Sequence, residues 1–377
     1  MTKPAAPPSE TPHEAAYPPA FFEHHLKTLS GPMKQWQLQN RIPPVLLLTG
    51  QSGIGKKAML HFLARWILCE TCETQKLLKP CEHCPPCQRT LSGHEVNLIE
   101  ITPETQEDAG TAPSTLKPST LKIDQFRKLK ATAGFHTEEG HPKVILIPNV
   151  EQMTPQAANS MLKLLEEPPA GWVFLMTTHD PTVLLPTLIS RCQVLRLKPF
   201  SCQQVEALLQ ALGVEPEKGK TCARISQGSW ARALQFADDQ NWEKRKEVLQ
   251  FLKNPAQNLS SLVDWSSQDH EHLTLLVDCL EQILSELISD LIFEKNIPNN
   301  IPESTPLTPA KNPAKHFWMT QAERLAQIRY ELTLPLNRKL LAQDLLLPWL
   351  ESESKRWLGA AGGQKSNPPS DQKGSFA

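Results

Sequence analysis

The chain has 377 residues, of which 40% are hydrophobic, and its formal net charge is −1. This length predicts two or three domains, each able to bury its own core. The near-zero charge provides no overall positive field, so any contact with nucleic acid should be local or made through partners. No apolar run approaches the roughly 20 residues that cross a bilayer, and the N-terminus has no hydrophobic signal region. We therefore expect a cytoplasmic protein with no membrane partner.

The first half of the chain alternates between predicted strands and helices. Residues 1–19 are rich in Pro and Ala and predict a disordered tail, and the helix that follows should break near Gly31-Pro32. Short apolar runs predict buried strands at 45–50, 96–101, 143–148, 172–178 and 193–200. Amphipathic helices separate them, and a Pro/Ser/Thr-rich loop covers about 102–119. The pattern predicts a doubly wound α/β domain at 20–200, with ligands at the carboxyl ends of its strands.

The second half contains helices alone. Residues 201–240 predict a small helical unit, and 241–357 predict longer amphipathic helices. Within them, about 295–315 holds too much Pro and Asn for regular structure and predicts a disordered loop. A disordered tail is expected at 358–377.

A glycine-rich turn joins the first strand to the next helix. Its sequence, GQSGIGKK at 50–57, fits the phosphate-binding pattern G-x-x-x-x-G-K-[S/T] except at Lys57. In such a loop glycine lets backbone N–H groups face phosphate oxygens, the lysine neutralises charge, and the final hydroxyl ligates magnesium. The residues predicted to face a nucleotide are Gly50, Gly53, Gly55 and Lys56. Because Lys57 cannot ligate a cation, the site is a degenerate P-loop.

The third strand lacks the acidic pair that an ATPase of this architecture places there. One acid of that pair belongs to the magnesium shell and the other polarises the attacking water. Here Pro148 and Asn149 occupy the two positions. Glu151 comes two residues later and could approach only through an altered backbone, so we expect it to be a surface acid. ATP hydrolysis is therefore not expected, and only weak, metal-independent ATP binding stays open.

Five of the nine cysteines crowd into CETCETQKLLKPCEHCPPC, residues 69–87. Short C-x-x-C turns present two sulfurs to one side of a tetrahedral zinc ion, and four ligands complete a structural site. The candidates are Cys69, Cys72, Cys81, Cys84 and Cys87, four of which should bind the metal. His83 is a weaker candidate because it lies inside a C-x-x-C turn. Which cysteine is the fourth ligand, Cys69 or Cys72, stays open.

Several motifs together resemble one family. NSMLKLLEEPP at 159–169, then VFLMTTHDP, then LLPTLISRCQVLRLKP, with the cysteine insertion after the P-loop helix, are similar to the bacterial clamp-loader AAA+ proteins of DNA polymerase III. The resemblance covers about residues 20–240 by motif. It implies an AAA+ fold with a RecA-like parallel sheet and an inserted zinc module at about 69–90. It also implies a helical lid at 201–240 and an all-α collar at 241–357.

The resemblance also assigns roles to residues. The family's first cysteine ends the P-loop helix, which favours Cys69, whereas its usual eight-residue gap favours Cys72; one inserted turn would reconcile the two. Arg191, with Ser190 and Cys192 as motif neighbours, would be an arginine finger acting on ATP in the adjacent subunit, since its forked permanent charge suits a γ-phosphate. Thr177 and Thr178 match the sensor position, where they would serve only local hydrogen bonds.

Within the family, the lost magnesium ligands and the retained arginine resemble the delta-prime subunits. The resemblance then implies a hetero-pentamer with gamma/tau and delta subunits that loads a sliding clamp onto primed DNA in replication. The chain itself would have no intrinsic ATPase but would belong to the DNA-directed DNA polymerase holoenzyme, a nucleotidyltransferase. Two alternatives stay open: a gamma/tau-like ATP-hydrolysing motor, and a zinc-containing DNA-binding protein with a degenerate AAA+ site.

Overall fold

A computed structural model describes residues 17–103, 120–132, 142–253, 255–268, 270–292, 313–332 and 336–348. The disordered tail predicted at 358–377, and nearly all of the segments predicted as irregular at 1–19, 102–119 and 295–315, lie outside the described residues. The chain divides into two compact units, Met1–Asp238 and Asp239–Ala377. We describe each unit by itself.

The first unit is built on a five-stranded sheet with the order β2-β3-β4-β1-β5. All four pairings in this sheet are parallel. The strands are β1 (Val45–Thr49), β2 (Leu98–Glu100), β3 (Lys143–Ile147), β4 (Trp172–Thr178) and β5 (Gln193–Arg196). The central strands β1 and β4 are buried along their whole length, as continuous apolar runs in a covered parallel sheet require.

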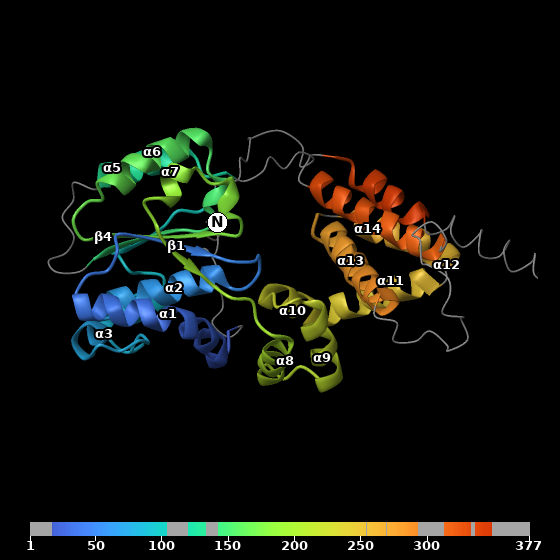
Figure 1. Cartoon of the computed structure of the whole chain (residues 1–377), viewed down its shortest axis with the longest axis horizontal. Helices are drawn as coiled ribbons and strands as arrows, with labels where there is room; N and C mark the ends of the chain where they lie inside the picture. Colours follow the sequence, from blue (N-terminus) through green and yellow to red (C-terminus); the bar gives the residue numbers. More distant parts are fainter. Residues whose placement is uncertain are drawn as a thin grey trace, which may run out of the picture. The chain divides into compact units, whose positions relative to one another are not determined.

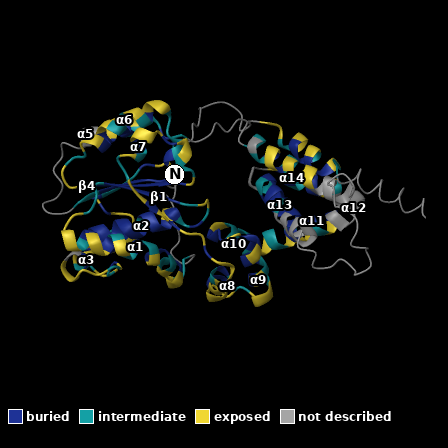
Figure 2. Cartoon of the chain, viewed as in Figure 1, coloured by how far each residue is buried: buried dark blue, intermediate teal, exposed yellow. Residues whose placement is uncertain are grey.

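Helices cover both faces of the sheet (Figure 1). One face carries α1 (Pro19–Gln39) and α2 (Lys56–Leu68), and the other carries α5 (Ile123–Thr132), α6 (Pro155–Glu166) and α7 (Pro186–Ile189). On the second face, Phe126 and Met161 are fully buried against Phe174 of β4. Figure 2 shows β1, β4 and most of α2 in the colour of buried residues. This arrangement confirms the predicted α/β domain with helices on both faces.

The predicted break in the first helix is wrong. α1 runs from Pro19 to Gln39 with Pro32 inside it. A proline in a helix interior removes one hydrogen bond and costs about 3 kcal/mol. Here the buried face continues on both sides of Pro32, with Leu29 and Met33 both fully buried. Packing of that continuous face, which includes Trp36 beside Trp66 of α2, offsets the local cost.

The strand ends bring the candidate site together. The P-loop follows β1, and Thr49 at its end lies beside Thr178 in the neighbouring strand β4. After β3 the chain turns at Asn149, whose φ of 55° is left-handed, into the short 3-10 helix η2 (Val150–Gln152). Another 3-10 helix, η3 (Pro181–Val183), follows β4. The carboxyl ends of three neighbouring strands, β3, β4 and β1, therefore lie at one edge of the sheet.

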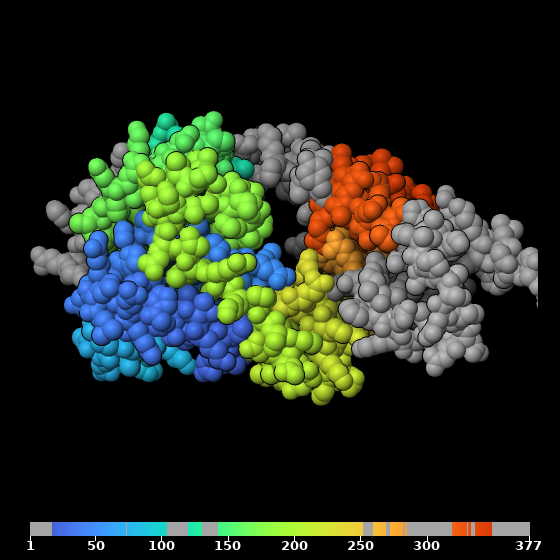
Figure 3. All heavy atoms as spheres, viewed as in Figure 1, coloured from blue at the N-terminus to red at the C-terminus, as the bar shows by residue number. Residues whose placement is uncertain are grey.

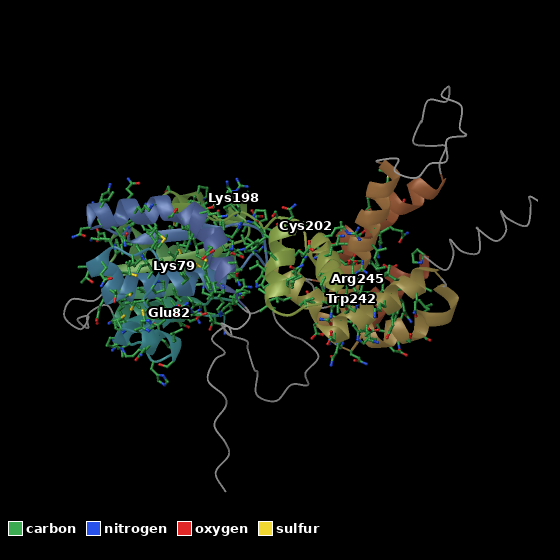
Figure 4. All side chains as sticks on the ribbon, turned by 90° about the horizontal axis from the view of Figure 1, so that it is seen from below. Lys79, Glu82, Lys198, Cys202, Trp242 and Arg245 are labelled. Atoms are coloured by element: carbon green, nitrogen blue, oxygen red, sulfur yellow. The ribbon has the colours of Figure 1, made fainter. Side chains whose placement is uncertain are left out.

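Three short helices complete the first unit: α8 (Cys202–Ala211), α9 (Pro216–Ile225) and α10 (Trp230–Ala237). Ser201 begins α8 with a capping box, in which its side chain and that of Gln204 each bond the other's backbone. Figure 4 labels Lys198 and Cys202, which mark the connection from β5 into α8. The three helices pack on one another through buried residues such as Leu209, Cys222 and Trp230.

The described part of the second unit is helical. Its helices are α11 (Asp239–Lys253), α12 (Pro255–Ser266), α13 (His270–Ile292), α14 (Pro313–Glu331) and a last helix at 338–348. α13 packs against α14, where Arg329 forms ion pairs with Asp278 and Glu281. No helix among the described residues is long and apolar enough to span a bilayer.

Candidate functional site

The P-loop glycines are required by contacts with two other helices. Gly53 and Gly55 have φ values of 76° and 90°, a region that residues with a Cβ rarely adopt. A Cβ on Gly53 would come within 2.2 Å of Ser229 Oγ, and one on Gly55 within 2.1 Å of the Phe21 ring. Larger residues are therefore excluded both by backbone conformation and by packing. The first turn of α10 also bonds the loop, since Ala231 N donates to Gly53 O at 2.8 Å.

The P-loop lysine is bonded to the loop itself. Lys56 Nζ donates to Gly50 O at 2.8 Å and to Gln51 O at 2.9 Å, and the residue is only 7% exposed. Burial lowers the pKa of Lys56 to about 8, and the negative charge of Glu151 acts in the opposite direction. Both carbonyl oxygens would lose a partner if the ammonium moved to a phosphate.

Glu151 is not the surface acid that the sequence predicted. Its side chain is only 9% exposed, and its Oε1 is paired with Nδ1 of His179. The buried Oε2 has no hydrogen-bond partner among the described residues. The left-handed turn at Asn149 provides the altered backbone that brings this carboxylate inward, close enough to act on Lys56. An internal acid therefore faces the loop lysine, although Pro148 and Asn149 carry none.

The residue in the magnesium-ligand position has a carboxylate partner instead. Lys57 Nζ lies 2.9 Å from Glu100 Oε1, at the end of β2, and His61 Nε2 lies 3.3 Å from Glu100 Oε2. Lys57 and His61 are one helical turn apart on α2, so both reach the same carboxylate. Burial acts to raise the pKa of Glu100, but the bonds and charges of His61 and Lys57 outweigh it and hold that pKa at about 2. A lysine charge thus lies in the place where a P-loop hydroxyl would hold the metal.

Four cysteines converge at the far end of α2. Their sulfur atoms all lie within 4.8 Å of one another, and the group comprises Cys69, Cys81, Cys84 and Cys87. Tetrahedral zinc with Zn–S bonds of 2.3 Å requires sulfurs about 3.8 Å apart, and Cys84 Sγ lies 3.9 Å from Cys69 Sγ. Backbone N–H groups donate to two of these sulfurs, as expected around thiolates: Cys81 N to Cys69 Sγ at 3.4 Å, and Cys84 N to Cys81 Sγ at 3.3 Å. The four side chains fit a structural zinc ion.

Cys72 lies outside this group. Its thiol donates to Lys79 O at 2.9 Å, and the residue is 2% exposed. The helix α3 (Glu70–Gln75) lengthens the loop between the first two members of the group, and Cys72 lies on it beside the group, where its N donates to Cys69 Sγ at 3.4 Å. His83 lies inside the turn from Cys81 to Cys84 and is not a member either. The last two cysteines of the group lie at the start of α4 (Pro85–Leu91). Cys84 is the N-cap residue of this helix, and Cys87 is in its first turn.

The cysteine module is bonded to α1 and α2. Leu77 O accepts from Gln37 Nε2 and from Trp66 Nε1, both at 2.8 Å. Lys79 Nζ also lies 3.1 Å from a carboxylate oxygen of Glu23 on α1. Lys79 and Glu82, labelled in Figure 4, belong to this module. Its bonds therefore join the two helices that cover one face of the sheet.

Arg191 follows α7, and its hydrogen bonds to other described residues reach neither the P-loop nor the cysteine group. Its Nη2 donates to Glu166 Oε1 at 2.6 Å, and its Nη1 donates to Thr187 O at 2.6 Å. The side chain is 32% exposed, in contrast to the buried Lys56. Figure 3 shows the α6 and α7 segments, in green, on the surface of the first unit. The guanidinium is thus held at the surface while part of it faces solvent.

The two neighbours of Arg191 fix the turn that carries it. Ser190 Oγ donates to Thr187 O at 3.1 Å and so bonds an end carbonyl of α7. Cys192 Sγ donates to Leu188 O at 3.0 Å and packs against the core of the sheet. Burial raises the pKa of Cys192 to about 12, so this thiol stays neutral. The serine and the cysteine anchor the turn on both sides of the arginine.

The two threonines at the end of β4 form local hydrogen bonds. Thr177 Oγ1 accepts from Asn149 N at 3.0 Å and thereby holds the left-handed turn after β3. Thr178 Oγ1 donates to Asp180 O at 3.0 Å. Both threonines are nearly fully buried. Among the described residues their contacts are those of structural side chains.

Comparison with known proteins identifies the family. A family model described as "DNA polymerase III, delta subunit" matches residues 27–201. DNA polymerase III subunit delta' of Escherichia coli K12 is 30% identical over 248 residues, which cover 63% of this chain and 70% of that protein. The chain belongs to the DNA polymerase III delta' family.

Two further proteins similar to this chain support the same family assignment. Subunit delta' of Yersinia pestis is 28% identical over 317 residues, covering 81% of this chain and 88% of that protein. Subunit tau of Escherichia coli K12 is 32% identical over 204 residues, but these cover 52% of this chain and only 29% of that protein. The delta' relatives are therefore matched over most of their length, and the tau relative over one part. The predicted AAA+ fold class is confirmed together with the family.

Three acidic residues that pair with side chains of the candidate site were missed or misjudged from the sequence: Glu100, Glu151 and Glu166. Glu100 could have been found, because it lies one residue before the end of the strand predicted at 96–101, near the sheet edge where ligands are expected. Glu151 depends on the left-handed turn at Asn149, which sequence spacing does not reveal. Glu166 lies inside the quoted motif LLEEPP, but only the structure shows that it meets Arg191.

Proposed function

We propose that this chain is a delta'-like subunit of the DNA polymerase III clamp loader and supplies Arg191 in trans to ATP in an adjacent gamma/tau-type subunit. The observation that carries the proposal is the contrast between its cations. Lys56 is buried and bonded to its own loop, whereas Arg191 is 32% exposed at the surface. An exposed, forked and permanent charge suits the γ-phosphate of a neighbouring nucleotide.

The proposal includes the absence of intrinsic ATPase activity. Hydrolysis needs a magnesium ligand in the P-loop and an acid that activates water. Lys57 occupies the first position and is paired with Glu100 at 2.9 Å. Pro148 and Asn149 occupy the acidic positions, and the carboxylate of Glu151 is paired with His179. These contacts support a site whose charged side chains are paired within the chain, while Glu151 Oε2 has no partner among the described residues.

A structural zinc ion is also part of the proposal. Cys69, Cys81, Cys84 and Cys87 would hold it, since their sulfurs alone form a metal-sized group among the described residues. With four thiolate ligands no open position is left for substrate, so the ion would stabilise the fold. The helical segments at 201–240 and 241–357 would act as lid and collar in a pentameric loader with gamma/tau and delta subunits in the cytoplasm. That loader would place a sliding clamp on primed DNA.

The first test is Arg191→Ala in the reconstituted complex. An arginine that acts in trans raises kcat about 10³–10⁵-fold at the nucleotide site of the neighbouring subunit. In the variant that one site should therefore stop hydrolysing ATP, and the total ATPase rate of the complex should fall by the part that this site contributes. Arg127→Ala is the matched control, because Arg127 is an exposed arginine whose ion pair among the described residues is a local one, with Asp124 at 3.1 Å. Assembly and melting temperature should be unchanged in both variants. Equal turnover of the two variants would refute the finger role.

The gamma/tau-like alternative predicts hydrolysis by the chain alone. The purified chain and its Lys56→Ala variant should show the same background rate of ATP hydrolysis if our proposal is correct. A rate that depends on Lys56 would favour the motor. The DNA-binding alternative predicts that the isolated chain binds primed DNA with a steep salt dependence. The formal charge of −1 does not favour that behaviour.

A further inference from the structure

The carboxylate of Glu166 is bonded to the arginine of the Ser-Arg-Cys motif. Glu166 is the last residue of α6, and it lies 25 positions before Arg191 in the chain. The distance from Arg191 Nη2 to Glu166 Oε1 is 2.6 Å. The contact therefore joins two separate helix ends and does not follow from spacing along one helix.

The position of Glu166 is unfavourable for α6 itself. The C-terminal end of a helix carries partial negative charge, so acidic side chains destabilise it there and cations stabilise it. Glu167, the C-cap residue, adds a second acid at the same end. Arg191 is a cation beside Glu166. The contact with Arg191, rather than the stability of the helix, therefore accounts for the carboxylate at this position.

The guanidinium keeps donors that its own chain does not use. Arginine has five N–H groups in a fixed planar arrangement. Nη1 donates to Thr187 O at 2.6 Å and reaches Ser190 Oγ only at 3.5 Å, while Nη2 donates to Glu166. No described residue accepts from Nε. With side chains 32% and 50% exposed, Arg191 and Glu166 are both open to a neighbouring molecule.

We propose that Glu166 is a positioning residue for Arg191. Its carboxylate holds the guanidinium in the orientation in which the remaining N–H groups meet a phosphate of the adjacent subunit's nucleotide. A long side chain that is already fixed loses less rotamer freedom when the transition state forms. This inference rests on the proposed function, because it requires Arg191 to act in trans.

Glu166→Gln tests the inference with little change of shape. The amide keeps the length and an acceptor oxygen but removes the charge. Exposed ion pairs are weak, so we expect kcat at the served site to fall about two- to fivefold. KM for ATP should not change, because the contact acts on the transition state rather than on substrate binding. Glu167→Gln is the matched control: Glu167 is exposed at the same helix end and forms no ion pair with the other described residues.

A double-mutant cycle with Arg191→Ala separates the two proposals. If Glu166→Gln slows the complex but has no further effect in the Arg191→Ala background, the positioning role is supported. If it slows both backgrounds by the same factor, or does not slow the otherwise unchanged complex, the positioning role is overturned while the finger role stands. If Arg191→Ala itself leaves turnover unchanged, the finger role is overturned and the positioning role with it. The melting temperatures of the two glutamine variants should agree, which checks that neither loses folded protein.

Discussion

Two regions of the first unit use their charged side chains differently. In the P-loop and α2 (50–68), charged side chains bond within the chain: the buried Lys56 bonds two loop carbonyls, and Lys57, although 46% exposed, pairs with Glu100. At the end of α6 and after α7 (166–192), Arg191 is held at two points but stays partly exposed. Under the proposed function, the P-loop is retained for its packing, and the Ser-Arg-Cys motif retains a group that acts on a neighbouring subunit.

The difference has a physical basis in burial. Moving Lys56 from its carbonyls would leave buried acceptors without partners, which costs about 1–3 kcal/mol for each group. Turning Arg191 away from Glu166 breaks an exposed ion pair, which contributes at most about 1 kcal/mol. The first region should therefore respond to mutation through stability, and the second through activity. The predictions below test that distinction, beginning with the largest effect.

Removing one cysteine of the metal group should cause the largest loss of stability. Cys84→Ser should release zinc, because three thiolates no longer complete a structural site. A loss of about 3 kcal/mol or more in a unit of this size lowers the unfolding temperature by roughly 10 °C. Metal analysis and a thermal unfolding curve measure both effects. The rate per assembled complex should stay unchanged.

Cys72→Ser is the control for that variant. Cys72 is buried like Cys87 but bonds Lys79 O and lies outside the group. The variant should keep its zinc even if it loses some stability. If Cys72→Ser lost the metal and Cys69→Ser kept it, the assignment of the four ligands would be wrong.

Acid should destabilise the first region through Glu100. The pKa of this carboxyl is held at about 2, below its ordinary value of 4.5, so the folded state favours its charged form. Its contribution is complete above pH 4.5 and is lost as the pH falls from there through 2. The shift corresponds to at most about 3 kcal/mol. Urea unfolding between pH 6 and pH 3 should show this loss in the free energy of unfolding.

Lys57→Met sharpens the acid experiment. The variant removes one of the two partners that lower the pKa of Glu100, and it leaves His61 in place. Its free energy of unfolding should be lower at pH 6 and should fall less steeply toward pH 3. ATP turnover by the complex should not change. An acid response equal to that of the unchanged chain would show that this ion pair is not its source.

The sequence predicted the fold where apolar runs and helical periodicity agree. All five strands lie within their predicted ranges, because buried parallel strands such as β1 and β4 are continuous apolar runs. It failed at Pro32, where packing of the buried face of α1 overrides the local preference. Local propensity alone could not reveal that long-range compensation.

The candidate site was predictable in its residue types and less so in its contacts. The P-loop, the cysteines and Arg191 were found because their motifs are contiguous in sequence. The choice between Cys69 and Cys72 depends on how α3 folds, and the inward turn of Glu151 depends on one left-handed residue, Asn149. Such contacts are set by backbone turns and by packing between distant segments, which residue spacing does not encode.

In the region around Arg191 (166–192), Ser190→Ala should have the smallest effect on stability and activity. The hydroxyl donates to Thr187 O at 3.1 Å, and the same oxygen also accepts from Arg191 Nη1. Its removal therefore leaves no orphaned carbonyl and should cost only about 0.5–1 kcal/mol of stability. Because Arg191 keeps its bonds to Thr187 O and Glu166, turnover by the complex should fall less than about twofold.

Ser92→Ala is the matched control, since Ser92 Oγ donates to Arg89 O at 3.1 Å in the same position after a short helix but far from Arg191 in sequence. The two serine variants should lose similar stability, and only Ser190→Ala should affect turnover at all. A loss of activity as large as that of Arg191→Ala would mean that the hydroxyl itself acts on the nucleotide. The action on the neighbouring subunit's nucleotide would then belong to Ser190 as well as to Arg191.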